Sequence, residues 1–277
     1  MLSRLIRSLT GAAAGPAAGS IYVGLMGGLG NQLFQYAFAR FLAAEGVAVS
    51  GLVTNLFDGD HYARKPLLQG FARLPSAQLT RDEIARLSVL ADEDGMAIRD
   101  ALRAGGRSGV FCRGYWQDPR YADAVGAELA ADLSAFGTRF RPAAADACVL
   151  HVRRQDYGHH GLLPLRYYRA ALEACGSPRF SVVTDEPNFC AYVFAGVPGF
   201  AGVVRGDTAD PWGDFFRMAA ARVQIIANSS FSWWTAWLGS ATGATASVIA
   251  PAQWSLIDDA QRCPAAWQRI DVPLARP

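Results

Sequence analysis

Short apolar runs alternate along this chain with longer stretches whose apolar residues recur at helical spacing. Residues 21–26 form the first run, and in residues 32–45 the apolar side chains fall on one helical face. Residues 47–49 and 110–112 are further short apolar runs, and residues 121–133 again show helical spacing. A repeated alternation of strands and helices along a chain predicts an α/β fold with parallel sheets.

The second half of the chain repeats the alternation after a break. Residues 141–145, Arg-Pro-Ala-Ala-Ala, predict a loop or hinge. We therefore expect two Rossmann-like lobes facing a central cleft, an N-terminal lobe at residues 21–145 and a C-terminal lobe at residues 146–277. The predicted strands of the second lobe are residues 147–150, 180–183, 223–227 and 247–250, and its predicted helices are residues 167–174 and 211–221.

Two segments do not follow the alternation. Residues 1–20 start with a weakly amphipathic stretch and continue with Ala, Gly and Pro, which predicts a flexible N-terminal arm. The apolar part of this arm is too short and too interrupted for a membrane span or a secretory signal, and a weak contact with a membrane surface is the alternative. Residues 54–107 show little pattern, except that Thr80 and Glu83 have the spacing of a capping box.

Composition and charge narrow the class of protein. Of the 277 residues, 51% are hydrophobic and 18% are charged, which predicts a substantial core. The net charge of +2 argues against a nucleic-acid binder, which would carry a concentrated basic face. The five cysteines form no CxxC pair and the four histidines have no metal-ligand spacing, so we expect reduced thiols, no metal site and a cytoplasmic protein. Peripheral contact with the inner membrane is the alternative location.

The end of the run at residues 147–150 carries the first candidate chemistry. His151, Arg153 and Arg154 follow this buried run, as expected where a parallel strand emerges at the edge of its sheet. Open α/β sheets bind ligands at that edge, and the planar fork of arginine suits phosphate. Two solvated surface arginines beside a half-buried histidine are the alternative interpretation.

A glycine turn follows the first predicted strand. Gly28 and Gly30 stand between strand and helix, where backbone amides and the helix dipole favour anions. Leu33 occupies the position of the third glycine of a dinucleotide fingerprint, and the lysine and hydroxyl of a phosphate-binding P-loop are missing. The alternative is that these glycines only permit a sharp turn.

Two further strand ends carry polar residues. Asp185 closes a predicted strand, where a carboxylate accepts hydrogen bonds from ribose hydroxyls or a purine edge, or else caps a helix or loop. Residues 228–232, Asn-Ser-Ser-Phe-Ser, follow another strand and offer neutral donors at the start of a helix. Trp233, Trp234 and Trp237 then lie on that helix, either as core residues or as surfaces for sugar rings.

Four segments together resemble the bacterial α-1,2-fucosyltransferases, glycosyltransferase family 11. They occur in the family's order, and the likeness extends over residues 21–251. The segments are GGLGNQLFQYA at residues 27–37, GYWQ at 114–117, HVRRQDY at 151–157 and NSSFSWW at 228–234. The resemblance implies a GT-B-like fold and an inverting transfer of L-fucose from GDP-fucose to the 2-hydroxyl of a galactose in a bacterial surface glycan such as an O-antigen. It also implies that no metal or other cofactor is required.

The resemblance also implies roles for residues. The C-terminal lobe would bind GDP-fucose and the N-terminal lobe the galactose-terminated acceptor glycan. Without a metal, Arg153 is the best candidate to neutralise the departing diphosphate. The implied catalytic residues are Arg153, Asn31 and Asp156; the donor-binding residues are Gly28, Gly30, His151, Arg153, Arg154, Asp185, Asn228, Ser229, Ser230 and Phe231; the acceptor-binding residues are Gln32, Trp116 and Trp233.

Some assignments stay open at this point. Asp156 and His159 are candidates for the general base, Asp156 has the alternative role of fixing the arginine loop, and a transfer assisted by the donor phosphate needs no protein base. Glu186 stands where the family's usual Ser-Asp-Asp segment has its second Asp, which leaves the role of that carboxylate undefined. Two rival functions are a nicotinamide-dependent oxidoreductase and a carbohydrate-binding module without catalysis.

Overall fold

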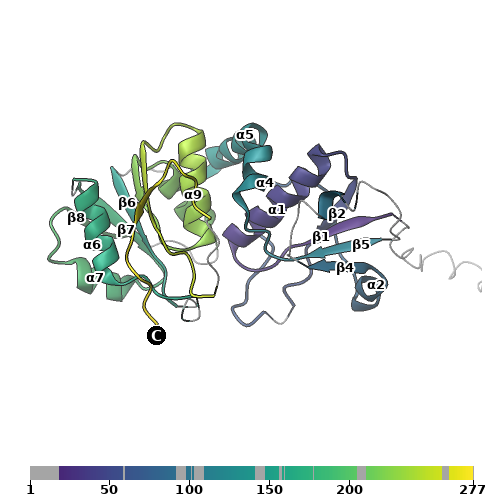
Figure 1. Cartoon of the computed structure of the whole chain (residues 1–277), viewed down its shortest axis with the longest axis horizontal. Coiled ribbons are helices and arrows are strands. Elements are labelled where there is room, and N and C mark those ends of the chain that lie inside the picture. Colours follow the sequence, from purple (N-terminus) through teal and green to yellow (C-terminus); the bar gives the residue numbers. More distant parts are fainter. Residues whose placement is uncertain are drawn as a thin grey trace, which may run out of the picture. The chain divides into compact units, whose positions relative to one another are not determined.

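The computed structural model in Figure 1 describes residues 19–58, 60–91, 98–100, 102, 109–140, 147–155, 158, 160–176, 178–204, 210–257 and 262–276. These residues form two compact units, one of residues 19–26 and Gln35–Trp116, the other of Gly27–Phe34 and residues 117–276. Each unit contains one sheet, and all pairings between the named strands are parallel. The predicted α/β fold with two parallel sheets is therefore confirmed. The first 18 residues of the predicted arm and the predicted hinge lie outside the described residues.

The first unit is built on a sheet of five strands in the order β3-β2-β1-β5-β4. The strands are β1 (Ile21–Gly24), β2 (Val49–Val53), β3 (Ser76–Ala77), β4 (Ser88–Ala91) and β5 (Val110–Arg113). Its helices are the greater part of α1 (Leu29–Ala44) and α2 (Arg81–Ala85). The predicted capping box begins α2: the Thr80 hydroxyl accepts a hydrogen bond from Glu83 N–H, and the Glu83 carboxylate accepts one from Thr80 N–H.

The strand order of the first sheet reverses between β1 and β5. Gln35 of α1 lies at the carboxyl ends of both strands, where its Oε1 accepts a hydrogen bond from Met26 N–H at 2.9 Å and its Nε2 donates one to the Gly114 carbonyl at 3.0 Å. Close by in sequence, Trp116 is fully buried and stacks on Phe38 with ring centroids 4.0 Å apart. Neutral and buried side chains therefore close this sheet edge.

The second unit is built on a sheet of six strands in the order β11-β10-β9-β6-β7-β8. The strands are β6 (Cys148–Val152), β7 (Phe180–Thr184), β8 (Phe200–Val204), β9 (Val223–Ile225), β10 (Ser247–Pro251) and β11 (Gln268–Ile270). The helices are α4 (Pro119–Ala124), α5 (Gly126–Gly137), the 3-10 helix η3 (Thr138–Phe140), α6 (Leu165–Ala174), α7 (Pro187–Phe194), α8 (Trp212–Ala219) and α9 (Ser230–Ala241).

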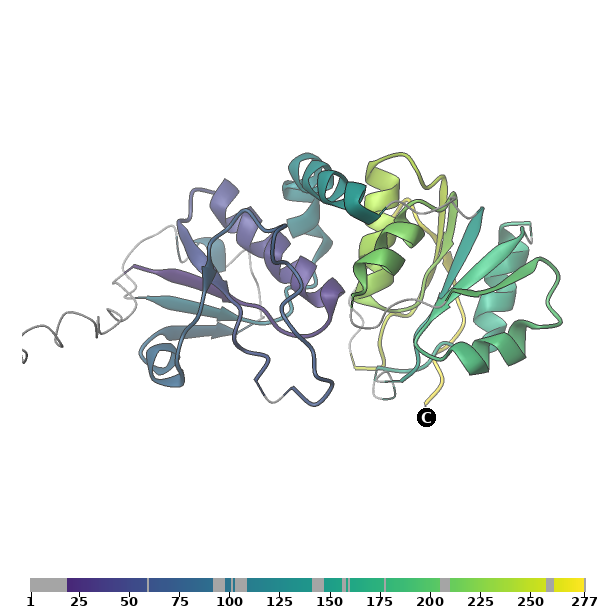
Figure 2. The ribbon, with the colours of Figure 1, turned by 180° about the vertical axis from the view of Figure 1, so that it is seen from behind.

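Helices cover both faces of the second sheet. Leu150 and Val152 of β6 belong to a buried cluster with residues of α6 and α7, whereas Val149 packs with Met218 of α8 and Phe231 of α9. Figure 1 shows α6 and α7 on one side of the strands and α9 on the other, and Figure 2 shows α8 beside α9. Side chains alternate along a strand, so the odd-numbered residues of β6 face α8 and α9.

Residues 117–140 pack differently from the prediction. We expected one helix over residues 121–133 in the first lobe, but two helices, α4 and α5, meet at Val125 and belong to the second unit. A side chain on Gly126 would lie 3.7 Å from Trp237 of α9, so the start of α5 rests closely on α9. A contact of this kind is set by tertiary packing.

The motif resemblance assigns the acceptor to the N-terminal lobe and the donor to the C-terminal lobe, and this division stays a prediction.

No helix among the described residues has the length and apolar content needed to cross a membrane.

Candidate functional site

The strand order of the second sheet reverses between β6 and β9. From β6 the chain builds β7 and β8 on one side, and β9, β10 and β11 on the other. β6 and β9 run parallel, with Leu150 opposite Ile225, so their carboxyl ends lie at the same edge. Ligands of open parallel sheets bind at such a reversal, outside the carboxyl ends of the strands. The candidate arginines follow β6, and the Asn-Ser segment follows β9.

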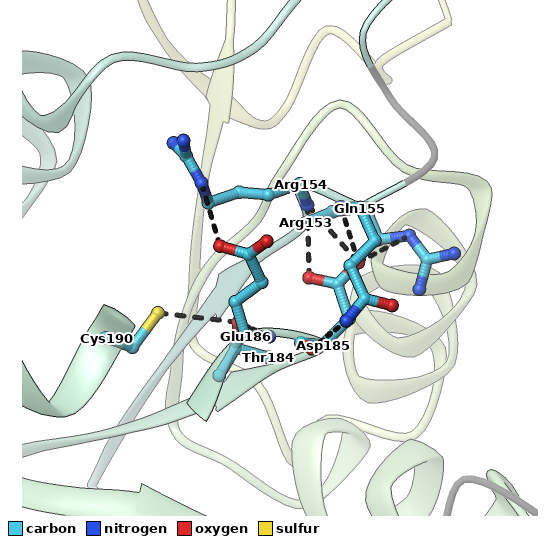
Figure 3. A network of polar contacts seen from close by, with 7 residues as sticks. All are labelled: Arg153, Arg154, Gln155, Thr184, Asp185, Glu186 and Cys190. Atoms are coloured by element: carbon cyan, nitrogen blue, oxygen red, sulfur yellow. Dashed lines mark hydrogen bonds and ion pairs between the residues drawn. The ribbon is translucent and has the colours of Figure 1, made fainter. Parts of the chain in front are cut away.

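Arg153 is tied to the neighbouring strand end by Asp185. Arg153 Nε lies 3.3 Å from Asp185 Oδ2, and the two side chains are 33% and 11% exposed. The same carboxylate accepts hydrogen bonds from the backbone N–H groups of Arg154 and Gln155, each at 3.1 Å. Figure 3 shows these contacts converging on one carboxyl group. Asp185 therefore fixes the turn that carries the arginines.

The electrostatics of Asp185 reflect this partly enclosed position. Burial raises the pKa of the Asp185 carboxyl above its ordinary value, although Arg153 and the two backbone N–H groups lower it. We predicted contact with a ribose hydroxyl or a purine edge for this residue. The structure instead directs the carboxylate to protein donors, and a donor contact by Asp185 stays a prediction.

Arg154 points in the opposite direction from Arg153 (Figure 3). Its Nε lies 3.4 Å from Glu186 Oε2, an ion-pair contact without hydrogen-bond geometry. Its guanidinium carbon lies 4.2 Å from the centre of the Phe189 ring on α7, within the range of a cation–π contact. Glu186, whose role the sequence left undefined, thus pairs with Arg154.

His151 is buried on the face of β6 that α9 covers. The centroids of the His151 and Phe231 rings are 5.6 Å apart, and His151 is 4% exposed. Burial, assisted by the nearby charge of Arg153, lowers the pKa of His151 from 6.5 to about 3. The imidazole is therefore neutral near pH 7 and supplies no positive charge to a phosphate. Its Nδ1 has no hydrogen-bond partner among the described residues.

Helix α9 begins at this edge without a side-chain cap. Ser229 stands at the N-cap in extended conformation, and its hydroxyl makes no capping hydrogen bond. Asn228 is turned away from the helix: its Nδ2 donates to the carbonyls of Gly161 and Trp254, each at 3.1 Å. The positive end of the α9 dipole thus remains uncompensated by any side-chain cap, which favours an anion here.

The glycine turn packs against this same first turn of α9. A Cβ on Gly30 would lie 2.3 Å from the backbone nitrogen of Phe231, whereas a Cβ on Gly28 would meet nothing within 4 Å. Gly30 therefore permits a close approach of two backbones. Asn31 Oδ1 accepts hydrogen bonds from Ser230 Oγ at 2.7 Å and from Gln117 Nε2 at 2.8 Å. The amide NH₂ of Asn31 is therefore the group of this side chain that remains for a ligand, to which it would donate hydrogen bonds.

The three predicted acceptor-binding residues lie in the core of the structure. Gln32, Trp116 and Trp233 are fully buried. Gln32 Nε2 donates to the Gly27 carbonyl at 3.0 Å, and Trp233 Nε1 donates to the Arg262 carbonyl at 2.7 Å. Trp234 is fully buried as well, and Trp237 is 7% exposed. The rings of Trp116, Trp233 and Trp234 are thus enclosed by protein, and acceptor contact by the three predicted residues stays a prediction.

Two predicted site residues lie outside the described residues, and two residues that contribute to the site were not predicted. Asp156 and His159, the candidates for a general base, fall outside. Gln117 and Phe189 were missed as contributors to the site, although Gln117 belongs to the GYWQ segment that carried the resemblance. Nothing in the sequence pattern near Phe189 indicated its contact with Arg154. Among the described residues, no group of three or more His, Cys, Asp or Glu could hold a metal ion.

Comparison with known proteins gives two glycosyltransferases. The chain is 26% identical over 293 aligned positions to an alpha-1,2-colitosyltransferase of Escherichia coli, covering 89% of this chain and 97% of that protein. It is 32% identical over 121 residues to the O-antigen biosynthesis glycosyltransferase WbnK of Escherichia coli, covering 40% of this chain and only 39% of WbnK. The likeness to an α-1,2 glycosyltransferase over most of the chain confirms the resemblance seen in the motifs. No protein-family model matches the chain.

Solved structures show a more distant likeness. The fucosyltransferase NodZ from Bradyrhizobium is 16% identical, with a TM-score of 0.43 over 78% of this chain and 91% of NodZ. The Escherichia coli heptosyltransferase WaaC is 11% identical, with a TM-score of 0.47 over 92% of this chain and 93% of WaaC. The fold class of the chain rests on its own two parallel sheets.

Proposed function

We propose that the chain is a metal-independent glycosyltransferase that moves L-fucose from GDP-fucose to the 2-hydroxyl of a galactose in a bacterial surface glycan. The similarity to an alpha-1,2-colitosyltransferase over most of the chain supports the α-1,2 transfer. The name of WbnK, an O-antigen biosynthesis glycosyltransferase, supports a surface glycan as the acceptor. GDP as the nucleotide is supported by the motif resemblance, and a diphosphate is supported by the arginine and the helix start at the β6/β9 edge.

One observation carries the proposal: Arg153 is fixed at the reversal of the second sheet, at the edge where α9 begins without a side-chain cap. When the bond between the fucose C1 and the diphosphate oxygen breaks, negative charge grows on the diphosphate. A fixed guanidinium and the positive end of a helix stabilise that charge without a metal ion. A preorganised donor of this kind contributes on the order of 10²–10³ in rate.

In an inverting transfer the galactose 2-oxygen attacks C1 from the side opposite the diphosphate, forming one C–O bond as the other breaks. The hydroxyl proton must leave during this step. His151, with a pKa of about 3, and Asp185, engaged by Arg153 and by backbone N–H groups, are poorly suited to take it. We propose Asp156 or His159 as the base, with proton transfer to the departing diphosphate as the alternative.

Colitose is a second candidate for the transferred sugar. It is supported by the name of the relative that matches over most of the chain. The arrangement of Arg153 and α9 concerns the diphosphate, and this arrangement suits either GDP-sugar equally well.

The direct test is transfer itself. The protein is incubated with GDP-fucose or with GDP-colitose and a panel of β-galactosides, and the linkage of the product is determined by NMR. We expect an α-1,2 linkage and no product from a matched acceptor that lacks the galactose 2-hydroxyl. Absence of transfer from both donors, or transfer to another hydroxyl, would overturn the proposal.

Two binding measurements separate the rival functions. Calorimetry with GDP is expected to give saturable binding, which a carbohydrate-binding module without catalysis would not show. Titration with NAD or NADP is expected to show no binding, whereas an oxidoreductase would bind one of these nucleotides.

Activity in excess EDTA is expected to be undiminished, and strict dependence on a divalent ion would contradict the metal-free transfer.

A further inference from the structure

Two consecutive carboxylates at the end of β7 hold the two consecutive arginines at the end of β6. Asp185 contacts Arg153, and Glu186 contacts Arg154. The two strands are neighbours and run parallel, with Val152 opposite Thr184, so both pairs of residues emerge from the same sheet edge. In Figure 3 the two guanidinium groups point in opposite directions from this edge.

Asp185 makes more contacts with the arginine turn than one ion pair requires. Its Oδ1 accepts a hydrogen bond from Arg154 N–H, and its Oδ2 accepts one from Gln155 N–H and lies beside Arg153 Nε. Gln155 Nε2 in turn donates to the Asp185 main-chain carbonyl at 2.8 Å. The backbone of residues 153–155 is thus clamped to the end of β7 through both the side chain and the main chain of Asp185.

Glu186 and Phe189 hold Arg154 on the other side. The ion pair with Glu186 and the contact with the Phe189 ring direct the Arg154 guanidinium toward α7. His151, two residues before Arg153, lies on the face of β6 that α9 covers, against Phe231. The Arg153 guanidinium points away from that of Arg154 (Figure 3). The paired carboxylates therefore hold the two arginines in opposite directions.

We propose that Asp185 and Glu186 are positioning residues that sort the two arginines, so that Arg153 is presented to the diphosphate of the donor and Arg154 fastens the turn to α7. This inference rests on the proposed function. It gives Asp185 a role exerted through Arg153, in place of a contact with ribose or purine. It also explains why two adjacent arginines, which repel one another, are both kept in fixed orientations.

The physical advantage lies in preorganisation. A free arginine loses much rotamer freedom when it binds an anion, and a displacement of about 1 Å at a reacting group costs on the order of 10²-fold in rate. Holding Arg153 through its Nε fixes the plane of the guanidinium before the donor arrives. Clamping the backbone on both sides of Arg154 fixes the point from which the Arg153 side chain extends.

A double-mutant cycle tests this role. Asp185→Ala is expected to lower kcat by about 10–10²-fold, and Arg153→Ala by about 10²–10³-fold. If Asp185 acts through Arg153, the double variant is no slower than Arg153→Ala alone, because the cycle measures the coupling between the two. Multiplicative losses, with a weaker GDP Kd when Asp185 is removed from the Arg153→Ala protein, would mean that Asp185 contacts the donor itself and would overturn the inference.

Two matched variants sharpen the cycle. Asp185→Asn keeps an acceptor oxygen for the backbone but loses the charge, so it is expected to retain more activity than Asp185→Ala. Arg154→Ala is expected to cost at least about tenfold less in kcat than Arg153→Ala, since Arg154 faces α7. Equal losses for the two arginines would overturn the proposed division between them.

A readout independent of activity separates this inference from the proposed function. Amide hydrogen exchange at Arg154 and Gln155 is expected to accelerate in Asp185→Ala, because both N–H groups lose their acceptor. Unchanged exchange would show that Asp185 does not hold the turn. Faster exchange in a protein that neither binds GDP nor transfers fucose would keep the clamp and refute only the proposed function.

Discussion

Each of the two sheets of this protein has one reversal of strand order, but the side chains at the two reversals differ in chemistry. Between β1 and β5, the fully buried amide of Gln35 bonds to the main chain at both strand ends. Between β6 and β9, the edge instead carries the charged Arg153 and the uncapped start of α9. Topology therefore provides two candidate sites, and the side chains decide which one is suited to an anion.

The difference extends to how polar groups are satisfied. At the first reversal, the Gln35 amide pairs with main-chain groups inside the core, so these hydrogen bonds add stability. At the second reversal, the polar groups include the Arg153 side chain, which is 33% exposed, and the buried His151, whose Nδ1 has no partner among the described residues. A buried nitrogen without a hydrogen-bond partner costs stability, and such groups are frequent at sites that bind a ligand.

The largest expected effect comes from removing the charge of the second reversal. Arg153→Ala is expected to lower fucose transfer by about 10²–10³-fold, since the diphosphate loses its fixed guanidinium. The free energy of unfolding should change little, because the side chain is partly exposed. Steady-state kinetics and urea unfolding of the same preparation measure both quantities. Near-normal turnover would remove Arg153 from the mechanism.

Arg153→Lys serves as the matched variant. It keeps the positive charge but not the planar fork or an Nε placed against Asp185. We expect a loss between that of wild type and that of Arg153→Ala. Full activity of the lysine variant would show that charge alone is sufficient.

The second expected effect concerns the close approach at α9. Gly30→Ala would place a Cβ 2.3 Å from the Phe231 nitrogen, so the first turns of α1 and α9 must separate. We expect a loss of about 3 kcal/mol in unfolding free energy together with weaker GDP binding. Gly28→Ala, which meets nothing within 4 Å, is the control and should be nearly neutral. Equal behaviour of the two variants would contradict the packing role of Gly30.

A third effect depends on pH and on His151. Its pKa is about 3 in the folded protein against an ordinary 6.5, so below about pH 6.5 the unfolded chain binds a proton that the folded chain rejects. Stability is therefore lost as pH falls from 6.5 toward 3, by roughly 2–3 kcal/mol over the first two pH units.

Urea unfolding of wild type and His151→Gln between pH 7 and pH 4.5 measures this contribution. The wild-type curve should fall more steeply with acid, since the glutamine variant has no group to titrate at this position. Parallel pH dependence of the two proteins would show that His151 is not held neutral by burial.

The smallest expected effect lies at the first reversal. Gln35→Ala leaves the Met26 N–H and the Gly114 carbonyl without their side-chain partner, for a loss of about 1–2 kcal/mol in unfolding free energy. GDP affinity should not change, because the diphosphate contacts we propose come from the second sheet. A marked loss of GDP binding in this variant would break the contrast between the two reversals.

Much of the fold was readable because local pattern and local structure agree. The predicted strand at residues 180–183 and the predicted helix at residues 167–174 match β7 and α6 within two residues. Short edge elements such as β3 and β11 were missed, since two or three residues carry too little pattern. Helices α4 and α5 were predicted as one helix, because nothing local signals the break at Val125.

The apolar run at residues 147–150 is followed at once by charged residues, and this pattern already predicts that Arg153 and Arg154 leave a buried strand at its carboxyl end. The sequence pattern likewise predicts that Asp185 and the Asn-Ser segment each follow a strand, and in the structure β6 lies between those two strands. The three-dimensional fold was needed to show which carboxylate meets which arginine, why Gly30 must lack a side chain and which tryptophans are enclosed. Those outcomes depend on contacts between residues far apart in the chain, such as Arg153 with Asp185 and Gly30 with Phe231, and no local spacing encodes them.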